Sequence, residues 1–273
     1  MSYIKEIGST HNPLVRSAMA LKEKSRERKK NGLFIIEGLK ELQLAIKGQY
    51  ALKTVLFYPE LISGNAVLEL VDGIFPAPEI ISISKDIFQK LAHRDTTEGV
   101  LGIAVAREHP LESLTFKNDS PLILVAEAPE KPGNIGALLR TADAAGLDAV
   151  IIANPKSDLY NPNIIRSSVG CVFTTHIAMG STPEIIQFLT SRHIAINCAA
   201  LSASTPYTEV DFTKGTAIVV GTEATGLSEQ WLNKADQNII IPMHGEIDSM
   251  NVSVSAAILI FEARRQRGSK TAL

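Results

Sequence analysis

The residues best suited to chemistry lie at the ends of apolar runs in the second half of the chain. In Glu127–Gly146 (EAPEKPGNIGALLRTADAAG), a loop rich in Pro and Gly precedes a helical segment that begins near Asn134 and carries Arg140. Gly133 and Gly136 allow a ligand to approach the backbone closely. The stretch contains neither G-x-G-x-x-G nor G-K-[ST], so it is not a dinucleotide fingerprint or a phosphate-binding P-loop.

A second stretch, Gly221–Leu227 (GTEATGL), follows the apolar run AIVV directly. A glycine at the carboxyl end of a strand is typical of the place where open α/β sheets bind ligands. Between Thr222 and Gly226 stands a single carboxylate, Glu223, which is placed for a hydrogen-bonding or charge role. A structural turn with an exposed glutamate explains this stretch equally well.

The third stretch, Ile239–Arg267, starts with an apolar run that ends at Pro242, and a polar loop then leads into a helix from Val252. Four residues occupy the junction between loop and helix: Ser249, Met250, Asn251 and Ser253. Free backbone N–H groups and polar side chains at a helix N-terminus often form a ligand site. A capped core helix is the plainer interpretation of this stretch taken alone.

These stretches belong to a regular alternation of strands and helices over residues 121–273. Strands are expected at residues 121–126, 149–153, 172–177, 194–198, 216–220 and 238–241, and helices at 134–145, 162–169, 183–191 and 252–267. Strands of a parallel sheet are buried on both faces and read as continuous apolar runs. The pattern therefore predicts a three-layer α/β/α domain around a parallel sheet.

Residues 1–107 predict a smaller α/β domain, and the polar segment 108–120 is the predicted linker. Residues 1–107 carry 15 Lys and Arg against 12 Asp and Glu, whereas residues 108–273 carry 12 against 17. The basic run near the start is suited to phosphates, although such runs are more often solvated helix ends. The candidate RNA-binding cations are Lys22, Lys24, Arg26, Arg28, Lys29, Lys30 and, in the second part, Arg166.

The composition excludes several classes of protein. There is no apolar run of about 18 residues, so no membrane span is expected, and the N-terminal segment lacks the apolar core of a signal peptide. Cys171 and Cys198 make neither a disulfide framework nor a metal site. We expect a cytoplasmic protein with no metal and no membrane partner.

The three stretches together are more specific than any one of them. N-x-G-x-x-x-R after a strand, then G-x-E-x-x-G-L, then I-P-M with S-x-N-V-S, occur in this order. They closely resemble the three motifs of the SpoU (TrmH-like) branch of the SPOUT methyltransferases, which methylate the ribose 2′-hydroxyl of RNA. FIIEG at residues 34–38 and TEGVLGI at 97–103 resemble the ribosomal-protein-like substrate-binding domain that precedes the catalytic domain in many members.

The resemblance implies S-adenosyl-L-methionine (AdoMet) as cofactor, RNA as partner and a homodimer in which one subunit's arginine completes the other's site. It also implies a deep trefoil knot, a rare exception to the usual rules of chain connection. The implied AdoMet-binding residues are Gly221, Ile241 and Met250, with Thr222, Glu223, Gly226, Pro242 and Met243 beside them. Met250 stands where the family usually has leucine, and methionine fills the same space.

The resemblance further assigns a polar catalytic set: Asn134, Arg140, Glu223, Ser249 and Asn251. The ribose 2′-oxygen would attack the sulfonium methyl in line, so alignment and loss of the hydroxyl proton are the main tasks. Arginine is a poor proton acceptor because its pKa is above about 12. We therefore expect Arg140 to hold the adjacent phosphate and stabilise the developing alkoxide, with a phosphate or a water as proton acceptor.

Three alternatives stay open. The chain is a transfer RNA methyltransferase, although the two-domain layout favours ribosomal RNA. It is a non-catalytic RNA-binding protein that keeps the knotted dimer and does not bind AdoMet. Or it is a nucleotide- or NAD-dependent enzyme on a doubly wound sheet, which the missing fingerprint disfavours.

Overall fold

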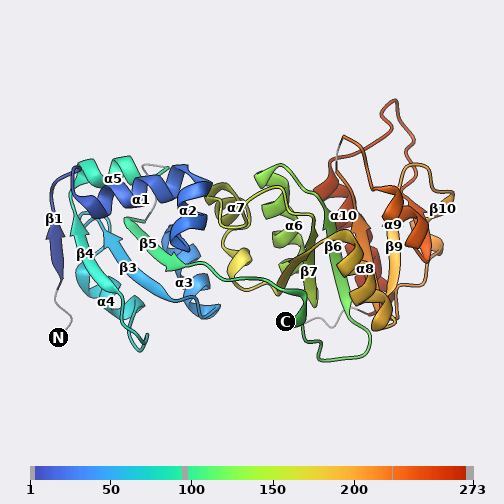
Figure 1. Cartoon of the computed structure of the whole chain (residues 1–273), viewed down its shortest axis with the longest axis horizontal. Coiled ribbons are helices and arrows are strands. Elements are labelled where there is room, and N and C mark those ends of the chain that lie inside the picture. The colour runs from blue at the N-terminus through green and yellow to red at the C-terminus, as the bar shows by residue number, and fades with distance from the viewer. Residues whose placement is uncertain (1–3, 94–97, 223, 269–273) are drawn as a thin grey trace. The chain divides into compact units, whose positions relative to one another are not determined.

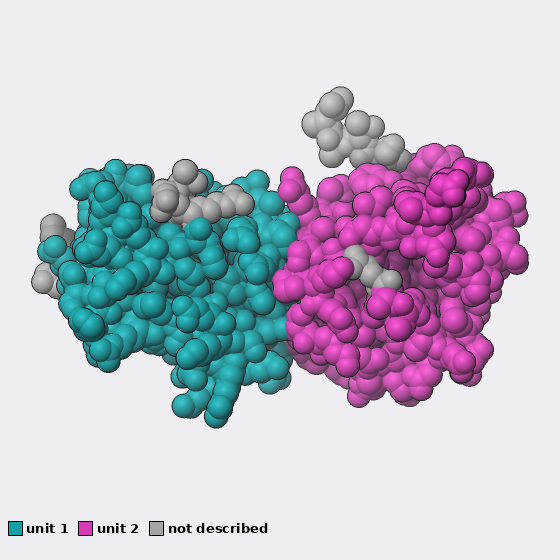
Figure 2. Space-filling view, turned by 90° about the horizontal axis from the view of Figure 1, so that it is seen from above, with its two compact units in different colours: residues 1–108, 158–174 teal, residues 109–157, 175–273 magenta. Residues whose placement is uncertain are grey.

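The computed structural model describes residues 4–93, 98–222 and 224–268. The chain forms two compact units, shown in separate colours in Figure 2. Unit 1 comprises residues 1–108 and 158–174, and unit 2 comprises residues 109–157 and 175–273. The predicted segments 1–107, 108–120 and 121–273 are functional assignments and stay predictions. These predicted segments take no account of residues 158–174, which belong to unit 1.

Unit 1 is built on a five-stranded sheet with the order β1–β4–β3–β5–β2 (Figure 1). The strands are β1 (Lys5–Ile7), β2 (Leu33–Glu37), β3 (Leu52–Phe57), β4 (Glu79–Ile83) and β5 (Val100–Val105). β1, β4 and β3 run parallel, whereas β5 is antiparallel to both of its neighbours. This mixed sheet belongs to the small α/β domain that the sequence predicts for the first part of the chain.

The helices of unit 1 are α1 (Pro13–Glu23), α2 (Ser25–Asn31), α3 (Leu39–Lys47), α4 (Gly64–Leu70), α5 (Lys85–Leu91), α7 (Pro162–Ser167) and the 3₁₀ turn η2 (Cys171–Phe173). α1 packs on α5 and β2, and α7 also contacts β2. Val15, Ala18 and Leu21 on α1 face the core of the sheet. The basic run forms α2, which ends at Gly32 in the left-handed conformation that glycine favours at a helix end.

Residues 158–174 join unit 1 through aromatic side chains. Tyr160 stacks on Phe34 with ring centroids 4.2 Å apart, and Phe173 lies 5.8 Å from the same ring. The strand predicted at residues 172–177 is wrong, because Phe173 is drawn into this cluster and its segment forms η2. The strand β8 (Ile177–Gly180) begins only after the chain has returned to unit 2.

Unit 2 is built on a seven-stranded parallel sheet with the order β10–β12–β9–β11–β6–β7–β8. Its other strands are β6 (Leu122–Glu127), β7 (Ala149–Ala153), β9 (Ala195–Ala199), β10 (Thr205–Pro206), β11 (Thr216–Val220) and β12 (Gln237–Ile240). The predicted fold class, a parallel α/β domain preceded by a small α/β domain, is confirmed. The side chains of β6, β7 and β11 are completely buried, which is why these strands read as continuous apolar runs.

Helices cover both faces of this sheet. The helices are α6 (Pro132–Ala145), α8 (Thr182–Ser191), α9 (Glu229–Lys234) and α10 (Val252–Gln266), and short 3₁₀ turns are η1 (Leu111–Ser113) and η3 (Tyr207–Glu209). α8 packs with α9, and α6 packs with α10. Trp231 of α9 is fully buried in the core of this unit, and both cysteines are buried.

Two further features bear on the predicted layout. In the predicted linker 108–120, Leu111 and Leu114 are buried in the core of unit 2, so these residues are part of that unit. Among the described residues no helix has both the length and the apolar character needed to cross a membrane.

Candidate cofactor and catalytic site

The carboxyl ends of three neighbouring strands of unit 2 enclose a cavity of about 410 Å³. Its walls come from the loops after β9, β11 and β12 and from the first turn of α10. Gly221 of the second stretch and both Ile241 and Met250 of the third stretch line it. A volume of this size lies in the range of pockets that hold small molecules and cofactors. The structure therefore brings the second and third stretches together around one cavity.

Gly221 opens the β11 loop at a point with no room for a side chain. A Cβ atom there would lie less than 3.0 Å from backbone atoms of Gly226 and Leu227. The loop closes on itself, because Thr222 N–H donates to the carbonyl oxygen of Gly226 (3.0 Å) and Gly226 N–H to that of Thr222 (3.1 Å). Gly226 has a φ of +67°, a conformation that favours glycine. Both glycines therefore shape one wall of the cavity.

The end of this loop is fastened to β6. Glu127, the last residue of β6, is 6% exposed, and its carboxylate accepts hydrogen bonds from the N–H of Ser228 (2.8 Å) and the hydroxyl of Ser228 (2.7 Å). The hydroxyl of Thr182, at the start of α8, donates to the same carboxylate (3.2 Å) and accepts from Trp231 Nε1–H (3.1 Å). A buried carboxylate with several donors holds its neighbours in fixed positions.

A second cavity of about 290 Å³ lies on the other side of the β11 loop. It shares Gly221, Thr222 and Val252 with the first cavity and is lined in addition by Asn134 of α6. Asn134 Oδ1 accepts a hydrogen bond from Asn251 Nδ2 (3.2 Å). Asn251 also caps α10, because its side-chain oxygen accepts from Ser253 N–H (3.0 Å). Two members of the predicted polar set are thus joined beside both cavities.

The other predicted residues take different places. Arg140 is an exposed residue of α6 and is absent from the walls of both cavities as they are formed by the described part of the chain. Ser249 lines the larger cavity and donates to Asp248 Oδ1 (3.1 Å). Met243 lines it as well, whereas its neighbour Pro242 does not. Glu223 lies outside the described residues.

Sequence reasoning missed one wall of the cavity, residues 199–202 after β9. The available signal was their place at the carboxyl end of a predicted strand, where open α/β sheets bind ligands. These residues carry small or apolar side chains without an ionisable group, so no motif marked them.

Among the predicted RNA-binding cations, the assignment of Arg28 is corrected by the structure. It is 4% exposed, its Nε donates to Asp158 Oδ2 (2.5 Å) and its Nη1 to the carbonyl oxygen of Leu21 (2.7 Å). Arg28 therefore fastens residues 158–174 within unit 1, and a buried guanidinium does not reach a phosphate. Lys24, Arg26, Lys29 and Lys30 are exposed. Lys22 is half-buried and lines a cavity of unit 1 that also includes Arg166.

The fold and the site define a class: an α/β protein with a cavity at the carboxyl edge of its parallel sheet, where open α/β sheets bind ligands. Comparison with known proteins gives the family. Residues 121–261 match the model of the SpoU rRNA Methylase family, and residues 12–102 match the MRM3-like substrate binding domain. The chain belongs to the SpoU rRNA Methylase family.

Individual relatives match over almost the whole chain. The 23S rRNA (guanosine(2553)-2′-O)-methyltransferase RlmP of Bacillus subtilis is 30% identical, over 96% of this chain and 100% of the relative. The crystal structure of an RNA 2′-O ribose methyltransferase is 35% identical with a TM-score of 0.82, covering 96% of this chain and 99% of the other. An AdoMet-bound rRNA methyltransferase from Sinorhizobium meliloti is 27% identical with a TM-score of 0.88, covering 97% and 99%.

Proposed function

We propose that this protein transfers a methyl group from AdoMet to a ribose 2′-hydroxyl of ribosomal RNA. The observation that carries the proposal is the cavity shared by Gly221, Ile241 and Met250, in a chain that matches RNA 2′-O-methyltransferases over 96% of its length. An enzyme of ribosomal RNA works where ribosomes are assembled, so we propose a cytoplasmic site of action.

The residues around the larger cavity fit AdoMet. The lining is mainly apolar side chains and backbone, and Ile241 and Met250 are suited to contact with the adenine ring. The missing side chain at Gly221 leaves backbone available to the ligand. When bound, AdoMet supplies an activated methyl group on its sulfonium. The role of the protein is to hold that group and the ribose oxygen in line.

We assign the RNA side of the reaction to the smaller cavity and α6. Asn134 and Asn251 fix each other, and so position the start of α10 beside α6. A guanidinium is a permanent cation with several N–H donors, so we assign Arg140 to the phosphate next to the reacting ribose and to the developing alkoxide. Its exposure outside the two cavities supports a role in a neighbouring subunit's site.

We also propose a homodimer formed through α10. Val254 is 48% and Phe261 is 51% exposed, and Ala257 and Ile258 lie between them and are half-buried. These positions recur at intervals of three, four and seven residues, so they form one apolar stripe on the helix. Such a stripe supports packing against α10 of a second copy of the chain. The late insertion of β11 between β6 and β9 is consistent with the knot expected for the family.

The dimer is tested by Phe261→Glu, with Phe75→Glu as the control, because Phe75 is 96% exposed and lies in unit 1. Sedimentation velocity should give a dimer for the wild type and the control, and a monomer for Phe261→Glu. A wild-type monomer at all concentrations would refute the proposal. Methyl transfer by the monomeric variant at the wild-type rate would show that Arg140 acts within its own subunit.

The reaction is tested with purified protein, radiolabelled AdoMet and ribosomal RNA from cells that lack this protein. We expect label in the RNA that resists alkaline cleavage at one phosphodiester, because a methylated 2′-oxygen cannot attack the adjacent phosphate. Arg140→Ala should keep AdoMet binding and lose transfer. Binding of RNA without AdoMet affinity would favour the non-catalytic alternative, and transfer to transfer RNA alone would change the substrate.

A further inference from the structure

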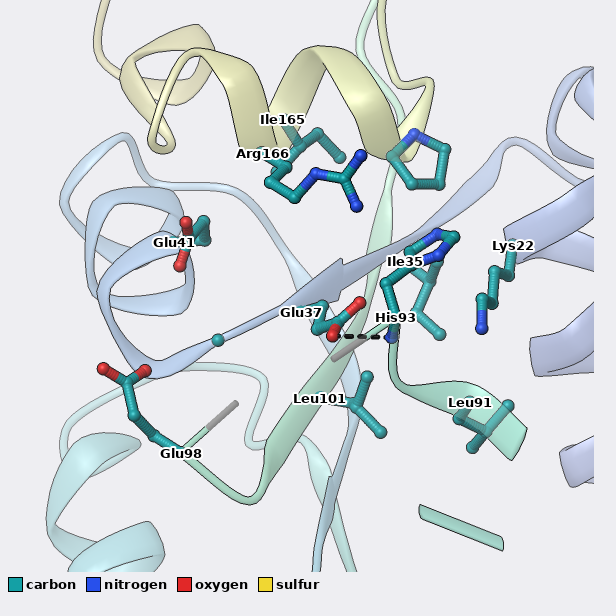
Figure 3. Close-up of a pocket in the computed structure, with 12 residues that line it drawn as sticks. Lys22, Ile35, Glu37, Glu41, Leu91, His93, Glu98, Leu101, Ile165 and Arg166 are labelled. Carbon is teal, nitrogen blue, oxygen red and sulfur yellow. Dashed lines mark hydrogen bonds between the residues drawn. The ribbon is translucent and has the colours of Figure 1, made fainter. Parts of the chain in front are cut away.

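Unit 1 contains a cavity of about 200 Å³ that the proposed reaction does not use. Its walls come from α1, β2, α3, α5, β5 and α7, so a helix from the second half of the sequence closes a pocket made mainly by the first (Figure 3). Pockets for drug-sized molecules start at about 300 Å³, so this one suits a fragment as small as a single planar ring system.

The cavity combines an apolar wall with a charged rim. Ile35, Leu91, Leu101 and Ile165 are each at most 3% exposed and provide apolar surface for the face of a ring. Five charged side chains form the rim: Lys22, Glu37, Glu41, Glu98 and Arg166. Figure 3 shows Arg166 and Glu37 on facing sides of the view, with Lys22 to one side of them and Glu41 and Glu98 to the other.

Hydrogen bonds fix several of these rim residues. Glu37 Oε1 accepts from the N–H of His93 (2.8 Å), and Glu98 Oε2 accepts from the N–H of Leu39 (2.7 Å). Lys22 Nζ donates to the carbonyl oxygen of Ala92 (2.9 Å). Pocket walls held in this way bind a ligand with less loss of conformational freedom.

Arg166 extends into the rim from α7. One of its five N–H groups donates to Asn163 Oδ1 (2.6 Å), which holds the planar guanidinium in place on its helix.

The charge pattern restricts the ligand. Three carboxylates against two cations disfavour a phosphate. Burial, together with the nearby charges of Glu98 and Glu37, raises the pKa of Glu41. The described residues contain no group of three or more His, Cys, Asp or Glu side chains arranged to hold a metal ion. What fits is a neutral planar group that offers hydrogen-bond donors along one edge and acceptors along another.

We propose that this cavity takes a guanine base turned out of the RNA substrate. Guanine alone among the four bases presents two adjacent donors, N1–H and the N2 amino group, to one carboxylate, and two adjacent acceptors, O6 and N7, to one arginine. Glu41 takes the donor edge and Arg166 the acceptor edge. Splayed bases of single-stranded RNA are recognised in this way, by both edges and by packing on the ring face.

The proposal rests on the proposed function in taking RNA as the ligand, and it concerns recognition and not the methylated nucleotide. The test uses the full chain and three uridine hexanucleotides that differ at one position: guanine, hypoxanthine or adenine. Hypoxanthine lacks only the N2 amino group. We expect the guanine oligonucleotide to bind about tenfold more tightly than the other two, as one good bidentate pair provides. Fluorescence anisotropy measures all three affinities.

Glu41→Gln should abolish the difference between guanine and hypoxanthine, and Arg166→Gln should weaken guanine binding by about tenfold. Glu69→Gln and Arg16→Gln, at exposed positions of unit 1 outside the cavity, are the matched controls and should bind like the wild type. Equal binding of the guanine and hypoxanthine oligonucleotides, a preference for adenine, or an unchanged preference in Glu41→Gln would overturn the proposal.

Methyl transfer to ribosomal RNA, measured in parallel, separates the two proposals. Methyl transfer without a preference for guanine would overturn the guanine site and leave the proposed reaction standing. A guanine preference that Glu41→Gln abolishes, without transfer, supports the guanine site and refutes the proposed reaction.

Discussion

Glu127 accepts two hydrogen bonds from one residue, Ser228, whose N–H and hydroxyl lie 2.8 and 2.7 Å from its two carboxylate oxygens. Ser228 follows the β11 loop directly, so the carboxylate at the end of β6 fixes the exit of the loop that forms the cofactor cavity. In Glu127→Gln an NH₂ group replaces one of the two carboxylate oxygens, and this group donates hydrogen bonds but cannot accept one. We expect unfolding free energy to fall by about 1–3 kcal/mol and AdoMet affinity to fall severalfold.

Urea denaturation and calorimetry with AdoMet measure these two effects. Glu229→Gln is the control, since this exposed residue of α9 lies next to Ser228 in the sequence. An unchanged AdoMet affinity in a Glu127→Gln protein of reduced stability would mean that the carboxylate supports the fold only.

Gly221→Ala tests the shape of the cavity. A methyl group at this position would lie under 3.0 Å from backbone atoms of Gly226 and Leu227, so the β11 loop has to move. We expect AdoMet binding to weaken at least tenfold, and methyl transfer at low AdoMet concentration to fall with it. Gly8→Ala is the control because nothing lies within 4 Å of a Cβ atom there. Wild-type AdoMet affinity in Gly221→Ala would place the cofactor elsewhere.

Arg28 and Arg26 are two residues apart but should behave differently. Arg28→Met leaves Asp158 buried without its partner, and breaking a buried pair costs about 3–5 kcal/mol. Arg26 is exposed, and a surface substitution should change stability by less than about 0.5 kcal/mol. If Arg26 contacts an RNA phosphate, Arg26→Met should reduce the slope of log affinity against log salt by about 0.7–1.

Thermal unfolding and RNA titrations at several salt concentrations separate the two arginines. A stable Arg28→Met protein with weakened RNA binding would return Arg28 to the RNA-binding set.

The buried thiol of Cys198 should make the stability of the fold depend on pH. Burial, with a smaller contribution from the charge of Glu127, raises the pKa of its thiol to about 12 from an ordinary value of 9.0. The unfolded chain therefore loses this proton first, and stability that is complete below pH 9.0 should be lost as the pH rises towards 12. The slope is at most about 1.4 kcal/mol per pH unit. Urea denaturation at pH 8 to 11 should show this loss in the wild type and a smaller one in Cys198→Ala; parallel curves would contradict it.

The sequence predicted what depends on local pattern. The strands β6, β7 and β11 were placed to within one residue because their side chains are buried on both faces of the sheet. The loops with Gly221 and Asn251 lie at one edge because the strands before them are parallel and end there. Arg28 was misassigned because its partner Asp158 lies 130 residues away in the chain. The 3₁₀ turn at residues 171–173 was missed for a similar reason, because Phe173 packs against Phe34 and Tyr50, which are also far away in the sequence. Local patterns carry no information on such long-range packing.

The backbone passes between the two units three times, after residues 108, 157 and 174. Neither a fragment ending near residue 107 nor one starting at 121 is therefore a complete folding unit. The first would lack Tyr160 and Phe173 from its aromatic cluster, and the second would carry Ile164, Ile165 and Phe173 with no surface to cover them. A chimaera that exchanges the N-terminal module with that of a relative must therefore transplant residues 158–174 as well.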